Sequence, residues 1–365
     1  MIVGVPKEIK AQENRVAMVP SGVGQLVKRG IEVVVESNAG AGADYSDAEY
    51  QAKGARIVAK HTDVFDQANL IVKVKEPQPS EIELLTRDHT LFTYLHLAAD
   101  KILTQTLVES GATAIAYETV GLGNRLPLLE PMSEVAGRMS ALVGAYFLAK
   151  HEGGRGTLLG GVPGVLPGRV VVIGGGTCGV NAAKVARGIG AETIILEIDH
   201  ERMRFLDDTL DCQTMYSSEA ALMELLPRTD LLIGAVLVPG AKAPKLVTRE
   251  MLREMKAGTV VVDIAVDQGG CVETTRPTTH ENPVFVEEGV IHYCVANMPG
   301  AYARTSTQAL ANVTLPYVQL LALEDVGGAC AIRPELIGGI NCQKGKLTCR
   351  EVAGAHDMEY HGPEL

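Results

Sequence analysis

The sequence lacks a hydrophobic run long enough to cross a membrane. Its longest nearly apolar stretch covers residues 231–241, well short of the roughly 20 residues that a spanning helix needs. The opening MIVGVPKEIK places a short apolar run before its lysines, whereas a secretory signal has the reverse order and a longer apolar core. We therefore expect a cytoplasmic protein with no membrane partner.

The usual cysteine and histidine motifs are also missing. The seven cysteines form no C-x-x-C pair, and the nine histidines show neither a zinc-site spacing nor an H-E-x-x-H motif. An odd number of cysteines in a long chain favours reduced thiols over a disulfide framework. The sequence thus predicts no metal site.

Basic residues are the minority among the charges. The 33 lysines and arginines face 44 aspartates and glutamates, which gives a formal net charge of −11. Because an acidic chain repels phosphate backbones, we expect no nucleic-acid partner. The length of 365 residues is more than one core usually serves, so two domains are expected.

Short β-branched segments alternate with helix-like segments along most of the chain. Nearly continuous apolar runs separated by helical lengths are typical of parallel sheets with helices on both faces. We predict an α/β fold with two doubly wound, Rossmann-like domains, the second inserted into the first. The first-domain runs cover residues 2–5, 31–37, 55–59, 70–75, 90–96 and 112–118, and the second-domain runs follow residue 168.

The predicted substrate domain is discontinuous and comprises residues 1–130 and 306–365. Residues 131–305 form the predicted dinucleotide-binding domain, with bridging helices near 133–150 and 305–322. Ser133 is a suitable N-cap for the first of these helices. The tail after the second helix has too little apolar sequence for a domain of its own, so we expect it to pack on the first domain.

A glycine-rich turn follows the apolar run RVVVI at residues 169–173. Gly174 allows a tight turn, Gly176 lets the backbone approach a pyrophosphate, and Gly179 lets the following helix pack closely on the strand. The amino end of that helix would face the phosphate charge. This strand–turn–helix context favours dinucleotide binding over an empty glycine turn in a Rossmann-like domain.

Glu197 ends the strand after this helix. A carboxylate there can accept hydrogen bonds from both ribose hydroxyls and would repel a 2′-phosphate, so the sequence favours NAD over NADP. Asp199 lies nearby and is the second candidate for this role.

Several polar residues stand near predicted strand ends, where open parallel sheets bind ligands. Arg15 follows the first strand, Lys75 closes the run 70–75, and His96 closes the run 90–96 with Tyr94 on the same face. The two cations can hold a carboxylate or carbonyl oxygen, and an imidazole exchanges protons near neutral pH. Asp267, at the end of a strand in the second domain, could hold that imidazole or bound ammonia.

Each of these residues also has a structural interpretation. A single lysine or arginine at a strand end is usually solvated, and a strand-end histidine is more often structural than catalytic. Their presence together at one sheet edge is what favours a substrate site.

Long motifs also carry a family resemblance. The sequence resembles the NAD-dependent alanine dehydrogenase/transhydrogenase family over nearly its whole length, including the tail at residues 339–353. The motifs are VGVPKEIKAQENRVAMVP (3–20), IVKVKEP (71–77), TYLHLAAD (93–100), PMSEVAGR (131–138), IGAVLVPGAKAPKLV (233–247), VVDIAVDQGGCVETTRPTTHENPVF (261–285) and CVANMPGAYARTST (294–307).

The resemblance implies reversible oxidative deamination of L-alanine to pyruvate and ammonia, with hydride transfer to nicotinamide C4 of NAD, in a homo-oligomer that is usually a hexamer. It implies His96 and Asp267 as catalytic residues, and Arg15 and Lys75 as contacts of the substrate carboxylate and carbonyl. Tyr94 and Met132 would border the substrate, and Asn297 would lie near both substrate and nicotinamide. Implied NAD contacts, besides Gly174, Gly176 and Gly179, are Ser133, Thr177, Cys178, Glu197, Arg202, Ser217, Val236, Leu237, Ile264, Asn297 and Met298.

Two departures and three alternatives accompany this resemblance. Many relatives have aspartate where this chain has Glu197, and alanine where it has Cys178. The alternatives are the NAD-binding subunit of a transhydrogenase, an amino-acid dehydrogenase for a larger substrate, and a non-catalytic NAD-binding oligomer. The last would not need Arg15, Lys75, His96 and Asp267 together.

Overall fold

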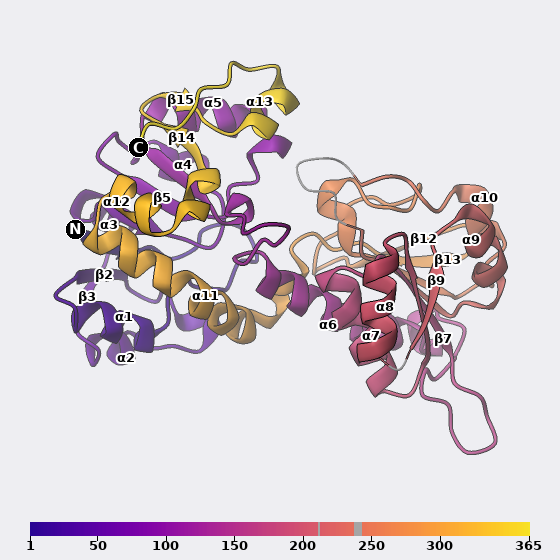
Figure 1. The fold of residues 1–365 in the computed structure, drawn as a ribbon. Helices are drawn as coiled ribbons and strands as arrows, with labels where there is room; N and C mark the ends of the chain where they lie inside the picture. Colours follow the sequence, from indigo (N-terminus) through magenta and orange to yellow (C-terminus); the bar gives the residue numbers. More distant parts are fainter. Residues whose placement is uncertain (211, 237–242) are drawn as a thin grey trace. The chain divides into compact units, whose positions relative to one another are not determined.

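The computed structural model describes residues 1–210, 212–236 and 243–365 (Figure 1). These residues form two compact units: unit 1 comprises Met1–Met132 and Tyr302–Leu365, and unit 2 comprises Ser133–Ala301. Helix α6 (Glu130–Phe147) carries the chain out of unit 1, and the 3-10 turn η7 (Met298–Tyr302) brings it back.

Unit 1 is built on an eight-stranded sheet with the order β15-β14-β6-β5-β4-β1-β2-β3. β1 to β6 are parallel, whereas β14 is antiparallel to β6 and β15 is antiparallel to β14. The tail of the chain therefore completes the sheet of unit 1. The strands are β1 (Ile2–Val5), β2 (Glu32–Glu36), β3 (Arg56–Val58), β4 (Leu70–Val72), β5 (Thr90–Thr93), β6 (Thr113–Ala116), β14 (Ile340–Gln343) and β15 (Lys346–Leu347).

Helices cover both faces of this sheet because side chains on both faces are apolar. In β2, Val33 and Val35 enter one buried cluster while Val34 enters the other, as the alternation along a strand requires. α11 packs beside α1 on the first face (Figure 1). The helices of unit 1 are α1 (Pro20–Val27), α2 (Asp47–Gln51), α3 (His61–Gln67), α4 (Pro79–Ile82), α5 (Lys101–Ser110), α11 (Ala303–Leu323), α12 (Val326–Ile332) and α13 (Arg350–His356), with 3-10 turns η1 (Ala41–Ala43), η2 (Leu97–Ala99), η3 (Tyr117–Thr119) and η8 (Pro334–Gly339).

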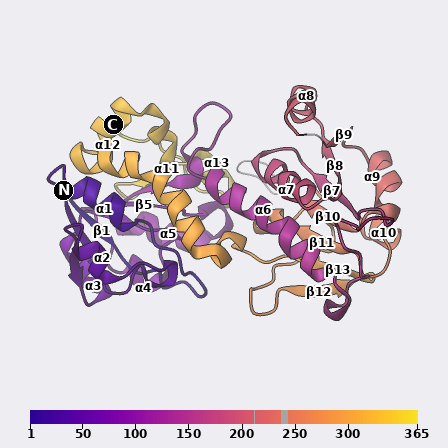
Figure 2. The same ribbon diagram turned by 90° about the horizontal axis from the view of Figure 1, so that it is seen from below.

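Unit 2 contains a seven-stranded sheet with the order β12-β13-β11-β10-β7-β8-β9, parallel except for the antiparallel pair β12–β13. Its helices α9 and α10 lie on one side of the strands and α6 on the other (Figure 2). Its strands are β7 (Arg169–Ile173), β8 (Glu192–Glu197), β9 (Gln213–Tyr216), β10 (Leu231–Gly234), β11 (Val260–Asp263), β12 (Val284–Glu287) and β13 (Val290–Tyr293). Besides α6, its helices are α7 (Thr177–Gly188), α8 (His200–Thr209), α9 (Glu219–Leu225) and α10 (Arg249–Arg253), with 3-10 turns η4 (Lys150–Glu152), η5 (Leu226–Arg228) and η6 (Ile264–Gln268).

Both sheets share one feature that places ligands. In each sheet the chain first adds strands on one side of its first strand and then returns to add strands on the other side. As a result, β1 lies beside β4 in unit 1 and β7 lies beside β10 in unit 2. The loops leaving these two neighbours run to opposite faces, and ligands bind in the crevice that this reversal opens. The predicted doubly wound α/β fold is confirmed.

Four local predictions were wrong. Lys75 does not close a strand, since β4 stops at Val72. Ser133 does not cap α6, because the helix begins at Glu130 and Pro131 fits its first turn. His96 lies beyond β5 with φ of +51°, so strand alternation does not relate it to Tyr94. Asp267 lies in η6 rather than at a strand end, since β11 stops at Asp263.

Within the part of the chain that the structure describes, no helix combines the length and apolar character that a membrane span requires.

Candidate functional site

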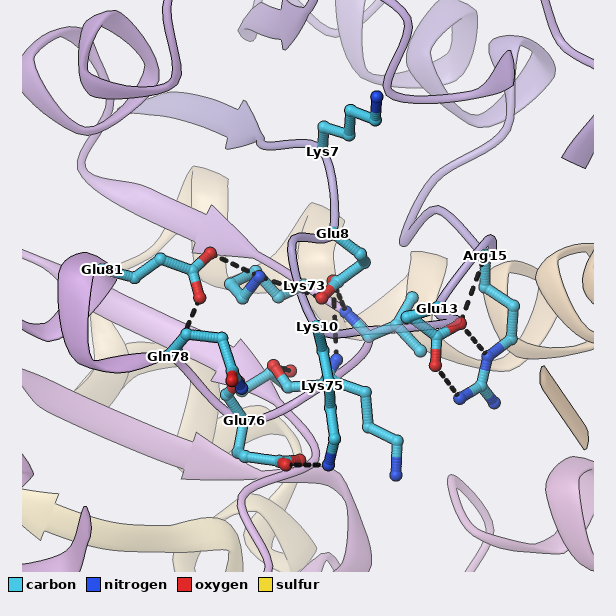
Figure 3. A network of polar contacts seen from close by, with 12 residues as sticks. Lys7, Glu8, Lys10, Glu13, Arg15, Lys73, Lys75, Glu76, Gln78 and Glu81 are labelled. Atoms are coloured by element: carbon cyan, nitrogen blue, oxygen red, sulfur yellow. Dashed lines mark hydrogen bonds and ion pairs between the residues drawn. The ribbon is translucent and has the colours of Figure 1, made fainter. Parts of the chain in front are cut away.

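In unit 1, charged side chains gather at the switch point between β1 and β4. The loop after β1 carries Glu8, Glu13 and Arg15, and the segment after β4 carries Lys73 and Lys75 (Figure 3). The carboxyl ends of two adjacent strands thus bring together residues that are far apart in the sequence.

Arg15 is buried and is held by Glu13 through a bidentate ion pair. Its Nε and Nη2 donate to the two Glu13 carboxylate oxygens, each at 2.6 Å (Figure 3). Its Nη1 lies 3.1 Å from Sδ of Met132. Burial disfavours the guanidinium charge, but Glu13 outweighs this and raises the pKa of Arg15 above its ordinary value. Arg15 is therefore an oriented cation with one edge already engaged.

Lys73 is fully buried and lies between two carboxylates. Its Nζ is 3.0 Å from Glu8 Oε2 and 2.7 Å from Glu81 Oε1 (Figure 3). Burial alone would lower the pKa of this ammonium group, but Glu8 and Glu81 together raise it. Lys75, two residues on, is also buried.

The buried charges continue as a chain away from Lys73. Glu81 Oε1 lies 3.2 Å from His61 Nε2, and His61 Nδ1 lies 2.7 Å from Glu36 Oε2. Burial would favour the neutral imidazole, but the two carboxylates raise the pKa of His61 to about 9. His61 is therefore charged at neutral pH, and it serves this network rather than proton exchange.

His96 stands just beyond β5 in a left-handed backbone conformation. The Glu118 carboxylate holds this turn, since Oε1 accepts the backbone N–H of His96 at 2.6 Å and of Leu95 at 3.0 Å. The His96 side chain is 40% exposed. An imidazole that reaches solvent and sits on a fixed backbone is suited to proton exchange with a bound ligand.

Glu76 is the acidic neighbour of that imidazole. Its Oε2 lies 3.7 Å from His96 Nδ1, and its Oε1 forms an ion pair with Lys10. Burial would raise the pKa of Glu76, but His96, Lys75 and Lys10 hold it well below its ordinary range. Glu76 is therefore a lasting negative charge that can orient and stabilise an imidazolium.

Tyr94 and Met132 form a buried wall close to these charges. Tyr94 OH donates to Leu128 O at 2.6 Å, and the Tyr94 ring lies 5.9 Å from the His96 ring. Burial raises the pKa of Tyr94 above its ordinary value, so its hydroxyl stays neutral. With Met132 on Arg15, it supplies an apolar surface beside the cations.

In unit 2, the glycine turn lies at the switch point between β7 and β10. Gly174 has φ of +97°, and a Cβ on Gly179 would lie 1.8 Å from Gly174 O. By contrast, a Cβ on Gly176, the N-cap of α7, would meet no atom within 4 Å. The turn is therefore closed toward the protein and open at the amino end of α7, where a pyrophosphate would approach.

Glu197 ends β8 and folds over the glycine turn. Its Oε2 accepts Gly175 N–H at 2.8 Å, while Oε1 accepts the N–H groups of Ile198 and Asp199 at 2.7 and 3.1 Å. Arg202 Nε donates to Gly175 O at 2.6 Å. Asp199, the second ribose candidate, instead caps α8. Glu197 thus shapes the turn with the carboxylate that was predicted to meet the ribose.

Asp267 is exposed on η6, in a loop organised by the buried Asp263. Asp263 Oδ2 accepts hydrogen bonds from Cys271 N–H, Val272 N–H and Thr275 Oγ1 at 2.9, 3.2 and 2.6 Å. These bonds end β11 and turn the chain, which explains why Asp267 is not on a strand.

The remaining predicted NAD-binding residues that the structure describes lie in unit 2. Asn297 has φ of +61° and its carbonyl accepts Gly300 N–H at 2.9 Å. Burial raises the pKa of the Cys178 thiol to about 12, which keeps it protonated. Leu237 lies outside the described residues. The others are Ser133 in α6, Thr177 at the start of α7, Ser217 after β9, Val236 after β10, Ile264 in η6 and Met298 in η7.

The acidic residues behind the predicted site were not among the candidate residues. Glu8, Glu13, Glu76 and Glu118 each hold a predicted residue or its backbone. One signal was available: Lys73 interrupts the apolar run LIVKVK, and a lysine buried within an apolar segment requires acidic partners. Among the described residues, no three His, Cys, Asp or Glu side chains form a group that could hold a metal ion.

Two family models match the chain. Residues 4–136 match the alanine dehydrogenase/PNT N-terminal domain, and residues 140–350 match the alanine dehydrogenase/PNT C-terminal domain. Alanine dehydrogenase of Halomonas elongata is 55% identical over 363 residues, covering 99% of this chain and 98% of that protein. Alanine dehydrogenase of Methanococcus maripaludis is 52% identical over 364 residues, with the same coverage.

Solved structures show the same similarity. A structure of L-alanine dehydrogenase superposes with a TM-score of 0.94 at 49% identity, over 98% of this chain and 99% of that one. A transhydrogenase from Sinorhizobium meliloti superposes with a TM-score of 0.81 at 24% identity, over 96% and 99%. The second match supports the fold alone.

Proposed function

The chain belongs to the alanine dehydrogenase/PNT family, and from this premise we propose that it is an NAD-dependent oxidoreductase that interconverts L-alanine with pyruvate and ammonia. The observation that carries the proposal is the group at the carboxyl ends of β1, β4 and β5. There Arg15, Lys75 and His96 are each backed by a carboxylate or fixed by one through the backbone. A protein that only binds NAD would not need these three residues together.

Arg15 and Lys75 supply the positive charge for a small carboxylate substrate. Glu13 occupies the edge of the Arg15 guanidinium that carries Nε and Nη2. A ligand would therefore have to approach from another side, which fixes the direction of approach. Lys75 would contact the carbonyl oxygen of pyruvate or the carboxylate of alanine as a point charge. Tyr94 and Met132 would border the methyl group and limit the size of the substrate side chain.

NAD fits the residues of unit 2. The open side of Gly176 at the α7 amino end suits a pyrophosphate, and Glu197 suits unphosphorylated ribose hydroxyls. The chemistry that bound NAD supplies is acceptance of hydride from the substrate Cα at nicotinamide C4. Asn297, Met298 and Ile264 would border the nicotinamide side of this site.

His96 handles the protons of the reaction. After the ammonium group of alanine has lost a proton to solvent and Cα has given up its hydride, water adds to the resulting C=N bond, and His96 takes the proton that this water loses. The carbinolamine then collapses to pyruvate and ammonia: His96 returns that proton to the leaving nitrogen and accepts the hydroxyl proton as the C=O bond forms. Glu76 stabilises the charged imidazole in between, and Asp267 is the second catalytic residue of the proposal.

The first test is a spectrophotometric assay of NADH with pyruvate and ammonium on the purified protein. We expect NADH oxidation that requires both pyruvate and ammonium. Oxidation with pyruvate alone would indicate a hydroxy-acid dehydrogenase, and a larger keto acid that outcompetes pyruvate would indicate a different amino-acid substrate. Absence of oxidation, with NADH binding intact, would overturn the proposed activity and favour a transhydrogenase subunit or a non-catalytic binder.

Substitution Glu197→Gln should weaken discrimination between NADH and NADPH. Removing a negative charge a few Å from a 2′-phosphate relieves about 1 kcal/mol of repulsion for each phosphate charge, so the kcat/KM ratio should shift toward NADPH roughly tenfold. Steady-state kinetics with both cofactors measure this. Asp199→Asn is the matched control, and a larger shift from that variant would assign the discrimination to Asp199.

A further inference from the structure

The backbone of Lys75 forms hydrogen bonds with side chains on both sides, through its N–H and through its carbonyl oxygen. Glu8 Oε1 accepts Val74 N–H at 2.6 Å and Lys75 N–H at 3.4 Å, while Glu8 Oε2 meets Lys73 Nζ at 3.0 Å (Figure 3). One carboxylate thus contacts three consecutive residues. On the other side of Lys75, Thr93 Oγ1 donates to Lys75 O at 2.9 Å.

The rest of the 73–75 backbone is bonded as well. Lys73 N–H donates to Phe92 O at 3.1 Å, Lys73 O accepts Tyr117 OH at 3.0 Å, and Val74 O accepts Tyr94 N–H at 3.3 Å. Strand β4 ends at Val72, and the hydrogen bonds to Phe92 and Tyr94 continue its pairing with the β5 segment as far as Val74. Among the hydrogen-bond partners named here, Glu8 has a charged side chain, and it comes from the loop after the neighbouring strand β1.

We propose that Glu8 is a positioning residue for Lys75, with Thr93 as its counterpart on the carbonyl side. The inference rests on the proposed function, in which Lys75 binds the substrate. Glu8 fixes the backbone from which the Lys75 side chain leaves, and Lys73 keeps the Glu8 carboxylate in place by binding its second oxygen. A long, flexible lysine side chain gains precision as a ligand contact when its backbone cannot shift.

A glutamine at position 8 cannot replace both functions of the carboxylate. Its single oxygen can face the Val74 and Lys75 N–H groups or the Lys73 ammonium, and its NH₂ group must then face the other donor. We therefore expect Glu8→Gln to lower kcat/KM for pyruvate about tenfold, mainly through KM. The KM for NADH should stay within twofold of the wild-type value.

A double-mutant cycle separates positioning from general damage. If Glu8 acts through Lys75, Glu8→Gln should cost less than twofold in pyruvate affinity once Lys75→Ala is present. Binding of pyruvate to the NADH complex without ammonium, measured by fluorescence of the bound NADH, gives this affinity even when turnover is slow. A tenfold loss in both backgrounds would overturn the proposal.

Two further variants keep the test decisive. Glu36→Gln breaks the far end of the same buried network without touching residues 73–75, so it should lower thermal stability and leave the pyruvate KM unchanged. If Glu8→Gln does not fold, Thr93→Val and Thr93→Ser replace it. The valine variant should raise the pyruvate KM and the serine variant should not, whereas equal values would contradict the inference. Inactive wild-type protein would instead mean that the proposed function fails.

Discussion

Replacing His96 with asparagine is expected to lower kcat for the amination of pyruvate at least 100-fold while NADH binding stays unchanged. A positioned acid–base group typically contributes about 10²- to 10⁴-fold to a proton-transfer step. Asparagine retains a polar side chain but exchanges no proton. It also tolerates the left-handed backbone, with φ of +51° at this position, better than most residues.

Steady-state kinetics and NADH fluorescence titration measure this result. His96→Ala should show the same loss of kcat with additional strain in the turn that Glu118 holds. His151→Ala, at a surface histidine in η4, is the matched control and should retain full activity. Turnover by His96→Asn within fivefold of wild type would remove His96 from the mechanism and turn attention to Asp267.

Replacing Lys73 with methionine should lower the free energy of unfolding by about 3–5 kcal/mol at pH 8, the cost typical of breaking a buried ion pair. Methionine matches the volume of the lysine side chain but leaves the buried carboxylates of Glu8 and Glu81 without their shared ammonium. Urea denaturation gives the value. Lys53→Met, at an exposed position, should change stability by no more than about 0.5 kcal/mol.

The loss caused by Lys73→Met should depend on pH in a defined direction. Burial raises the pKa of Glu8 above its ordinary value, and Lys73 offsets only part of that effect. Without Lys73 the folded-state pKa rises further, so the folded protein binds more protons than the unfolded chain, and stability falls as pH rises through that interval. The deficit should be smaller at pH 5 than at pH 8. Adding Glu8→Gln should recover part of it at pH 8, and an equal deficit at both pH values would contradict this account.

Local sequence patterns predicted the structural elements that depend on a few adjacent residues. The run RVVVI, the glycines after it and Glu197 at the end of the next strand appear in the structure as β7, the turn and the end of β8. Gly179 illustrates the reason, because the absence of a side chain there is required by one nearby carbonyl. A steric requirement of this kind can be predicted from the sequence alone.

Contacts between distant segments could not be predicted in this way. Glu8 and Glu13 look like solvated loop residues in the sequence, and only the pairing of β1 with β4 brings Glu8 to Lys73. The positions of His96 and Asp267 were assigned to strands because apolar letters continue past the true strand ends. The carboxylates of Glu118 and Asp263 accept backbone N–H groups just beyond those strands and turn the chain there, and these hydrogen bonds leave no periodic pattern in the sequence.

The antiparallel pairing of β14 with β6 has a consequence for how the protein is made. On the ribosome, the strands β1 to β6 emerge first, but the partner of β6 emerges only after the whole of unit 2. Unit 2 is one continuous segment and can fold as soon as it leaves the exit tunnel, whereas the nascent unit 1 must wait with β6 as an open edge. The part of the chain that is translated first is thus the last to be completed.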